Sequence, residues 1–385
     1  MRTEGRGPCV MVVAGEASGD LYGARLAVEL KKIFPDITCY GLGGDHMRQA
    51  GVHILADVSE LSVIGLVEVI RHYPRLLNIL NRMKRELKRI RPDVLVLIDS
   101  PDFNLRLAKQ AARSRTKVMY YVSPQIWAWR SSRIRVIRKC VDKMATVFPF
   151  EEKFYKDAGV PVEYVGHPLV EDAHPSMDKD AFLKAHRISS DKKLVGLFPG
   201  SRASEVEHNF PTLIQAASQL ALKRPDVQFV VPVASTLSAD FVQRFASDLQ
   251  ADITMSTAGI YDVINACDVI AATSGTVTLQ ITLMQTPMLI IYKLSPISYW
   301  ILSRLVNFTY AGIANVIANK EISRELIQHE ATPDNIVQEL EKLLSDTSYT
   351  AAMIAEMGSI REALGGKDGS AEAARLAAQL ITSSE

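Results

Sequence analysis

Cysteine is scarce in this sequence, and its spacing excludes the common cysteine-based sites. The four cysteines lie far apart, with no Cys-X-X-Cys pair and no Cys/His pattern typical of zinc ligands. Isolated thiols are typical of a reducing compartment, where disulfides rarely persist. We therefore expect no structural zinc ion and no disulfide framework.

A charge excess of one sign and long apolar runs are also missing. Lys+Arg 44 against Asp+Glu 43 leaves a net charge of +1, which gives no sign of a nucleic-acid binder. The first apolar run, 9–14, is too short for a signal peptide and is followed at once by Glu16 and Asp20. The longest charge-free apolar stretch, 305–319, contains asparagines and falls short of the about 18 residues needed to span a bilayer. These absences predict a cytosolic protein that can still lie on a membrane surface.

The apolar sequence that is present is enough for two domains. The 385 residues exceed the roughly 250–300 that one hydrophobic core supports, and hydrophobic residues make up 48%. Polar residues 174–193 are typical of a linker, and the glycine-rich break at 365–369 would let the terminal helix return to the first domain. We place the first domain at 1–172 plus about 352–385 and the second at 173–351.

Short apolar runs alternate with helical patterns in both halves, which predicts an α/β fold with doubly wound parallel sheets. After the first run, 8–14, the turn carries Glu16, and Ser18 or Asp20 is placed to cap the helix. A carboxylate in that turn suits hydroxyl groups better than phosphate, although an ordinary solvated acid explains it too. The dinucleotide-binding fingerprint fails, because position 46 is His46.

The run 93–99 is the cleanest strand, apolar throughout and therefore expected to be covered on both faces. Ligands of open α/β sheets bind at the carboxyl ends of the strands. Asp99 stands at that end, before Pro101, and is our candidate for a functional role. Asp102 is expected to cap the helix that follows.

Residues 60–90 carry more apolar side chains than one buried helix face needs. Leu66 and Ile70 belong to the first part, Pro74 is expected to end or kink it, and a second helix carries basic residues beside an apolar stripe. This combination suits a segment that lies on anionic lipid. A helix buried between the sheet and the second domain, with a solvated charged face, explains the pattern equally well.

Two tryptophans, Trp127 and Trp129, stand beside Arg130, and Arg133 follows on the next helix. Tryptophan rings most often pack at a domain seam. The two arginines also suit a sugar phosphate, so both interpretations stay open. His167, in a turn that leaves the sheet, is interpreted as structural.

Two turns in the second half have the composition of anion sites. The run 194–198 is followed by Pro-Gly-Ser-Arg and a helix, where Gly200 lets the backbone come close and Arg202 adds a full positive charge to the helix start. No Gly-Lys-Ser/Thr follows, so this is not a Walker loop. An ordinary strand-to-helix turn explains the pattern equally well.

The second such turn, at 274–276, places hydroxyl and N–H groups at the start of a helix that carries Gln280. Two anion-ready turns in one sheet argue for a diphosphate more strongly than either alone, although packing explains each one singly. Asp178-Lys179-Asp180 has the form of a metal-binding motif, but no strand precedes it. We therefore expect Asp178 to cap a helix and no metal to bind.

The sequence resembles the lipid-A-disaccharide synthase family in motifs that run in family order over essentially the whole length. They are AGEASGD (14–20), IDSPDFN (98–104), YVSPQIWAWR (121–130), VGHP (165–168), PGSR with EVE (199–207), SGT (274–276) and NVIANKEISRELIQ (315–328). The first and third together are specific, whereas PGSR or SGT alone would not be. The resemblance implies a GT-B-type architecture, with two Rossmann-like parallel-sheet domains facing a cleft and a C-terminal helix returning to the first.

The resemblance also implies an inverting transfer of 2,3-diacylglucosamine from UDP-2,3-diacylglucosamine to the 6-hydroxyl of 2,3-diacylglucosamine 1-phosphate. The products are a β-1,6 disaccharide 1-phosphate and UDP, and neither a metal nor another cofactor takes part. Such an enzyme is cytoplasmic and peripherally associated with the inner membrane that holds its lipid substrates. A homodimer is one option for its assembly.

The family's site positions carry over residue by residue and agree with the patterns above. Asp99 matches the proposed base, with Glu16 as a second catalytic candidate. On the acceptor and lipid side we place Ser18, Trp127, Trp129 and Arg130, together with Leu66 and Ile70, which come from the apolar segment and not from a family motif. On the donor UDP side we place Gly200, Ser201, Arg202, Ser274, Gly275, Thr276, Gln280 and Asn315. Gln280 stands where the family usually has Glu, so the contact to the ribose hydroxyls loses its charge-assisted strength and donor binding is expected to be weaker.

Two other functions remain open on these residues. A UDP-sugar epimerase has the same fold, but a wholly water-soluble substrate requires neither the Trp-Arg segment nor the surplus apolar surface. A non-catalytic lipid- or nucleotide-binding protein would not need to keep Asp99, Glu16 and Arg202 together.

Overall fold

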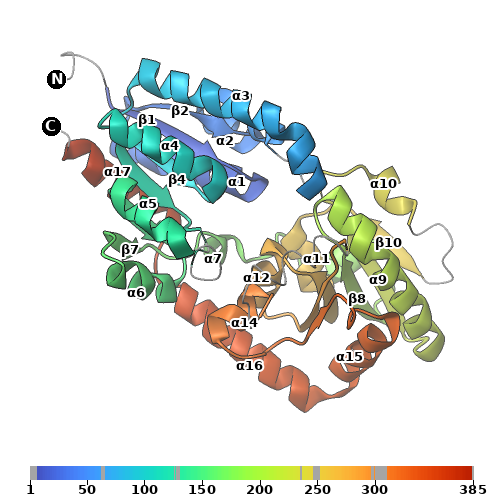
Figure 1. Ribbon diagram of the computed structural model, residues 1–385. Helices are drawn as coiled ribbons and strands as arrows, with labels where there is room; N and C mark the ends of the chain where they lie inside the picture. The colour runs from blue at the N-terminus through green and yellow to red at the C-terminus, as the bar shows by residue number, and fades with distance from the viewer. Residues whose placement is uncertain are drawn as a thin grey trace. The chain divides into compact units, whose positions relative to one another are not determined.

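A computed structural model describes residues 7–61, 66–124, 126, 131–234, 236–245, 252–295, 299 and 310–383, and at 17, 66–73 and 131 it describes the backbone only (Figure 1). The chain divides into two compact units. Unit 1 comprises Met1–Pro168 and Leu364–Glu385, and unit 2 comprises Leu169–Ala363.

Unit 1 is built on a 7-stranded sheet with the order β3-β2-β1-β4-β5-β6-β7, in which neighbouring strands run parallel. This is the order of a doubly wound fold, whose strand order reverses between β1 and β4. The central strands β1 and β4 are buried at every position, as their continuous apolar runs predict. The strands are β1 Cys9–Ala14, β2 Thr38–Gly43, β3 His53–Asp57, β4 Val94–Ile98, β5 Lys117–Tyr121, β6 Lys143–Thr146 and β7 Val162–Tyr164.

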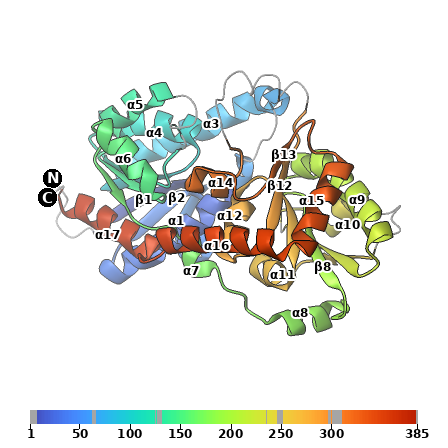
Figure 2. The same cartoon turned by 90° about the horizontal axis from the view of Figure 1, so that it is seen from below.

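Helices cover both faces of this sheet. Figure 2 shows α3, α4, α5 and α6 on one side of the strands and α1 and α17 on the other. Helix α17 packs along α1, which confirms the predicted return of the C-terminal helix to the first domain. The helices are α1 Ala17–Ile33, α2 Asp45–Gln49, α3 Leu66–Ile90, α4 Pro101–Arg113, α5 Ile134–Cys140, α6 Pro149–Asp157 and α17 Gly369–Thr382, with 3-10 turns at Val58–Glu60 and Ser131–Arg133.

Unit 2 has a 6-stranded parallel sheet with the order β10-β9-β8-β11-β12-β13. Helices α9 and α15 pack together on it, and α11 and α12 contact its central strands too. The strands are β8 Lys193–Phe198, β9 Val227–Pro232, β10 Ile253–Ser256, β11 Val269–Thr273, β12 Met288–Tyr292 and β13 Glu325–Ile327. The helices are α7 Leu169–Asp172, α8 Lys179–His186, α9 Ala203–Lys223, α10 Ala239–Gln243, α11 Ile260–Ala266, α12 Thr276–Leu283, α14 Ile313–Ala318, α15 Pro333–Ser345 and α16 Thr347–Leu364.

One domain boundary and two strands differ from the sequence prediction. Helix α16 belongs to unit 2 almost to its end, because Arg361 donates to the carbonyl of Leu283 and Met353 lies against Met288. Strands β3 and β13 were not predicted, since both are short edge strands with half-exposed residues and weak apolar patterns.

Pro74 was expected to end or kink this segment, and the first of these outcomes is wrong, because helix α3 continues through Pro74. An internal proline costs about 3 kcal/mol, but buried side chains beyond it, among them Met83 and Leu87, hold the helix on the sheet. No helix within the described residues is long and apolar enough to cross a bilayer.

Candidate functional site

In unit 1 the candidate site lies at the carboxyl ends of β1 and β4, where the strand order reverses. Ala14 pairs with Ile98 in the parallel register, so the turns that follow the two strands leave the sheet side by side. A Cβ added to Gly15 would lie 2.0 Å from Cβ of Ser100, which leaves room only for glycine there. The register therefore brings the predicted catalytic residues Glu16 and Asp99 to the same edge of the sheet.

The backbone at Asp99 is strained and is held by two side chains from the core. Asp99 and Ser100 have φ values of +50° and +44°, and such left-handed residues cost about 1–3 kcal/mol each. The buried Asn104 donates from Nδ2 to the carbonyls of Ile98 (3.0 Å) and Asp99 (2.8 Å). The hydroxyl of Tyr120 donates to the Asp99 carbonyl at 2.5 Å. The core thus fixes Asp99 through its carbonyl oxygen.

Tyr120 remains a protonated donor under ordinary conditions. Burial raises the pKa of Tyr120 well above its usual value, and the nearby charge of Asp99 raises it further. Its hydrogen bond to the Asp99 carbonyl is therefore retained at neutral pH.

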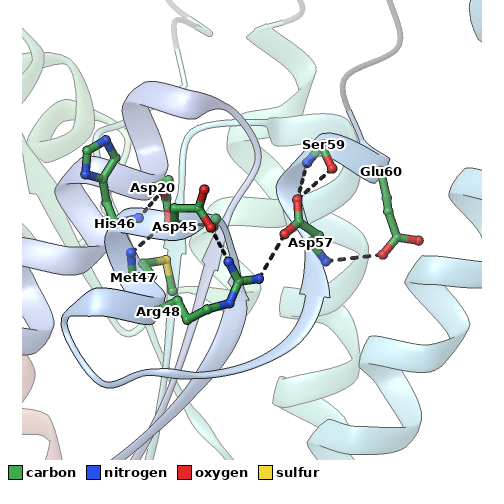
Figure 3. Close-up of polar contacts among 9 residues, drawn as sticks. Asp20, Asp45, His46, Met47, Arg48, Asp57, Ser59 and Glu60 are labelled. Carbon is green, nitrogen blue, oxygen red and sulfur yellow. Dashed lines mark hydrogen bonds and ion pairs between the residues drawn. The ribbon is translucent and has the colours of Figure 1, made fainter. Parts of the chain in front are cut away.

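The sequence suggested that Asp20 could cap its own helix, but in the structure it does not. Its buried carboxylate accepts hydrogen bonds from the N–H groups of Gly44 (2.6 Å), His46 (3.0 Å) and Met47 (3.2 Å), as Figure 3 shows for the last two. These groups lie at the start of α2. Asp20 therefore binds the turn after β2, and in the same close-up Arg48 pairs with acids of α2 and β3.

The other residues predicted for this side are only partly described. Glu16 is exposed at the N-cap of α1, and Ser18 is half-buried in the first turn. The predictions for five further side chains fall outside the described residues: Trp127, Trp129, Arg130, Leu66 and Ile70.

Asp102 is not the helix cap that the sequence suggested. Helix α4 has Ser100 at its N-cap, and Asp102 lies within the first turn, where it forms an ion pair with Arg133. The helix begins earlier than predicted because Pro101 takes its first position. The sequence suggested that Arg133 could bind a sugar phosphate, but in the structure Arg133 pairs with the Asp102 carboxylate.

In unit 2 both predicted anion turns lie at one edge of the sheet. Phe198 of β8 pairs with Ala272 of β11, again where the strand order reverses, so that the two turns leave the sheet as neighbours. Gly200 has a φ of +116°, a value that favours glycine. The hydroxyl of Thr236 donates to the carbonyl of Ser201 at 2.6 Å and fixes the first turn from the side of β9.

A carboxylate within the chain occupies the first turn, which sequence reasoning missed. The N–H of Ser201 donates to Oε2 of Glu205 at 3.0 Å, and Nη1 of Arg202 lies 3.2 Å from Oε1 of the same carboxylate. The available signal was a Glu in the first turn of the predicted helix, a position from which a carboxylate can reach back to N–H groups at the helix start.

The second turn is connected by a chain of hydrogen bonds to a buried asparagine, Asn315. Gly275 and Thr276 are exposed at the start of α12, while the hydroxyl of Ser274 donates to the carbonyl of Ala311 at 2.8 Å. The N–H of Ala311 in turn donates to Oε2 of Glu325 at 2.7 Å. The second turn is therefore held by the segment that precedes α14.

Asn315 lies at the other end of this network and is fully buried. Its Nδ2 donates to the carbonyl of Ser323 (2.7 Å) and to Oε1 of Glu325 (2.8 Å), while Oδ1 accepts from the N–H groups of Ile322 (2.8 Å) and Ser323 (3.0 Å). Asn315 is thus connected to the second turn only indirectly, by way of Glu325 and Ala311. Its side-chain amide makes its hydrogen bonds to other residues and not to the turn.

Sequence reasoning also gave too little weight to Lys293 at this edge of unit 2. Lys293 follows β12 directly, and its Nζ donates to the hydroxyl of Thr212 at 2.9 Å. Its signal was a cation placed immediately after a buried apolar strand. The edge therefore carries a second positive charge besides Arg202.

Two smaller predictions concern Gln280 and Asp178. Gln280 is half-buried on α12. Asp178 is confirmed as the N-cap of α8, with the N–H of Ala181 donating to it at 2.7 Å. The described residues contain no group of three or more His, Cys, Asp or Glu side chains placed to hold a metal ion.

The fold of the whole chain is similar to that of solved enzymes acting on sugars. A UDP-GlcNAc 2-epimerase from Neisseria meningitidis, solved with UDP-GlcNAc, is 13% identical, with a TM-score of 0.66 over 97% of this chain and 100% of that one. The glycotransferase of kitacinnamycin is 14% identical, with a TM-score of 0.66 over 98% of this chain and 99% of that one. At such identities the likeness shows the fold alone, which is that of GT-B enzymes.

Sequence relatives are much closer. The lipid-A-disaccharide synthetase family model matches residues 10–380. The lipid-A-disaccharide synthase of Trichlorobacter lovleyi is 44% identical over 94% of each chain, and that of Coxiella burnetii is 40% identical over 97% of this chain and 99% of its own. The chain therefore belongs to the lipid-A-disaccharide synthase family, a family of glycosyltransferases that synthesise the lipid A disaccharide.

Proposed function

We propose that the protein transfers 2,3-diacylglucosamine from its UDP donor to the 6-hydroxyl of 2,3-diacylglucosamine 1-phosphate, with inversion at the anomeric carbon. Asp99 removes the proton from the acceptor hydroxyl, and Glu16 and Ser18 position the acceptor. The products are the β-1,6 disaccharide 1-phosphate and UDP. The observation that carries this proposal is the clamped, strained backbone of Asp99 at the reversal point of the unit 1 sheet.

Inversion in one displacement needs a base on the acceptor hydroxyl. A carboxylate serves as such a base only if its position is fixed, because a misplacement of about 1 Å can cost about 100-fold in rate. Two buried donors that hold the Asp99 carbonyl supply that rigidity. Backbone strain of this kind is concentrated at functional sites.

The leaving diphosphate needs positive charge, which unit 2 supplies. Arg202, the N–H groups of the first turn and the start of α12 with Ser274, Gly275 and Thr276 are proposed to bind UDP. Gln280 would contact the ribose through its amide. Because these groups supply the charge, a chelator such as EDTA is expected to leave turnover unchanged.

The test uses purified protein, UDP-2,3-diacylglucosamine and 2,3-diacylglucosamine 1-phosphate, with UDP release and disaccharide formation followed together. Asp99→Asn should lower turnover roughly 100-fold or more and leave UDP binding intact. Asp157→Asn, which removes an exposed carboxylate of α6, is the matched control and should behave as wild type. Wild-type turnover in Asp99→Asn would remove that residue from the mechanism. An epimerase would instead convert a UDP-sugar without any acceptor.

The proposal includes peripheral association with the cytoplasmic face of the inner membrane. In residues 74–90 of α3 and in α4 and α5, the only acids are Glu86 and Asp102, each paired with an arginine, among many exposed Lys and Arg. Between α4 and α5 a hollow of about 510 Å³ is lined by Ala112, Val136 and Cys140 with the cations Lys109, Arg113, Arg135 and Lys139. Since the whole chain has a net charge of only +1, this concentration of cations on one layer suits anionic lipid headgroups.

Sedimentation with lipid vesicles tests the membrane association. Wild-type protein should bind phosphatidylglycerol vesicles more strongly than phosphatidylcholine vesicles, and Lys109→Glu with Arg135→Glu should weaken that binding, since each basic residue contributes about 1 kcal/mol near an anionic surface. Lys184→Glu with Lys192→Glu makes the same charge change on unit 2 and serves as the control. Equal loss in both variants would show that net charge, and not this layer, is responsible.

A further inference from the structure

The first anion turn of unit 2 contains its own anion. The carboxylate of Glu205 accepts from the Ser201 N–H at 3.0 Å and lies 3.2 Å from Nη1 of Arg202, the two groups that the proposed function assigns to the donor diphosphate. The Arg202 side chain is 40% exposed and that of Glu205 is 19% exposed, so the pair borders solvent. A diphosphate that used both groups would have to displace this carboxylate.

Glu205 is packed closely onto the turn. A Cβ added at Gly200 would lie 2.6 Å from both Cβ and Oε2 of Glu205, so the glycine is what admits the side chain. Tyr292 at the end of β12 lies nearby. Burial raises its pKa, the charge of Glu205 raises it further, and Arg202 acts in the opposite direction. The carboxylate and the guanidinium therefore share one partly buried environment.

The backbone that carries Glu205 is fixed by a buried asparagine of the same helix. Asn209 is fully buried and donates from Nδ2 to the carbonyl of Glu205 at 2.9 Å, while its Oδ1 accepts from the N–H of Lys293 at 2.8 Å. These bonds tie the first turn of α9 to the segment after β12. Because the helix start is held, the carboxylate can leave the turn only by rotation of its own side chain.

We propose that Glu205 is an internal competitor of the donor diphosphate: it occupies Arg202 and the Ser201 N–H in the free protein and is displaced when UDP binds. This inference rests on the proposed function, because it concerns the same donor site. Glu205 lowers the affinity for UDP and so limits inhibition by this product. Its negative charge opposes a ligand that carries at least two, at a partly desolvated site where charges interact more strongly than in water.

The test compares UDP with uridine in wild type, Glu205→Gln and Glu207→Gln by competitive displacement of a labelled UDP probe. Glutamine keeps the size of the side chain and an acceptor for the Ser201 N–H but removes the charge. Glu205→Gln should therefore bind UDP about tenfold more tightly and leave uridine affinity unchanged, since uridine has no phosphate. Glu207 is exposed on the same helix, and its variant should match wild type.

Steady-state kinetics supply a second measurement, one that would not change in this way if Glu205 had only a structural role. In Glu205→Gln the inhibition constant of UDP and the KM of the donor should fall together, while kcat changes less than either. Unchanged or weaker UDP binding in Glu205→Gln would overturn the inference and would show that Glu205 orients Arg202 for the ligand. Failure of wild type to bind UDP at all would overturn the proposed function and this inference with it.

Discussion

Asn104 offers the sharpest test of how unit 1 holds its proposed base. Asn104→Ala removes two hydrogen bonds, one to the carbonyl of Ile98 (3.0 Å) and one to that of Asp99 (2.8 Å). The Asp99 carbonyl keeps the Tyr120 hydroxyl at 2.5 Å, but the Ile98 carbonyl loses this side-chain donor. An unsatisfied buried polar group costs about 1–3 kcal/mol.

Loss of this clamp should also let the strained turn relax. Asp99 and Ser100 together store on the order of 2–6 kcal/mol of backbone strain, at about 1–3 kcal/mol each. Relaxation of this strain offsets part of the lost hydrogen bonding, so we expect Asn104→Ala to destabilise unit 1 by at most about 1–3 kcal/mol, and turnover to fall at least about tenfold as Asp99 leaves its position. UDP affinity should stay unchanged, because the donor groups belong to unit 2.

The assay combines urea unfolding followed by circular dichroism, steady-state turnover and UDP binding on the same preparations. Asn104→Asp keeps the size but cannot donate when ionised, so it should resemble the alanine variant. Tyr120→Phe removes the other donor to the Asp99 carbonyl and should also lower turnover. Wild-type turnover in Asn104→Ala, with an unfolding midpoint unchanged, would refute the idea that this clamp positions Asp99.

Two further predictions concern other buried groups. Asn315→Ala should destabilise unit 2 by at least about 2 kcal/mol and weaken UDP binding through Glu325 and the Ser274 turn, and equal UDP affinity in the variant would disconnect this network from the donor site. Burial lowers the pKa of His167 to about 3, against about 6.5 for the unfolded chain, so the unfolded state binds the proton more tightly and stability is lost as the pH falls below about 6.5. Urea titrations at pH 7 and pH 5 should therefore differ by about 2 kcal/mol more in wild type than in His167→Gln, and equal differences would assign the acid sensitivity to other groups.

The sequence by itself determined the architecture and the location of the candidate site. Apolar runs alternating with helical patterns give two parallel α/β sheets, because such runs must be covered on both faces. The turns after those runs then contain the candidates, since parallel strands present their carboxyl ends at one edge of the sheet. Asp99, Arg202 and Ser274 were found in this way, and Asp178 was recognised as a cap because its partner N–H lies in the same short segment.

Only the tertiary structure decided which polar group serves which partner. Asp20 binds the start of α2, and the Tyr120 hydroxyl donates to the carbonyl of Asp99. In both pairs the partners lie far apart in the sequence, so no local sequence pattern predicts them. Buried donors and acceptors must find partners wherever strand register and helix packing place them, so these pairings follow from the assembled sheet and not from the neighbouring sequence. For the same reason Asn315 is a candidate binding residue in the sequence, whereas in the structure its amide is hydrogen-bonded within its own unit, to Ser323 and Glu325.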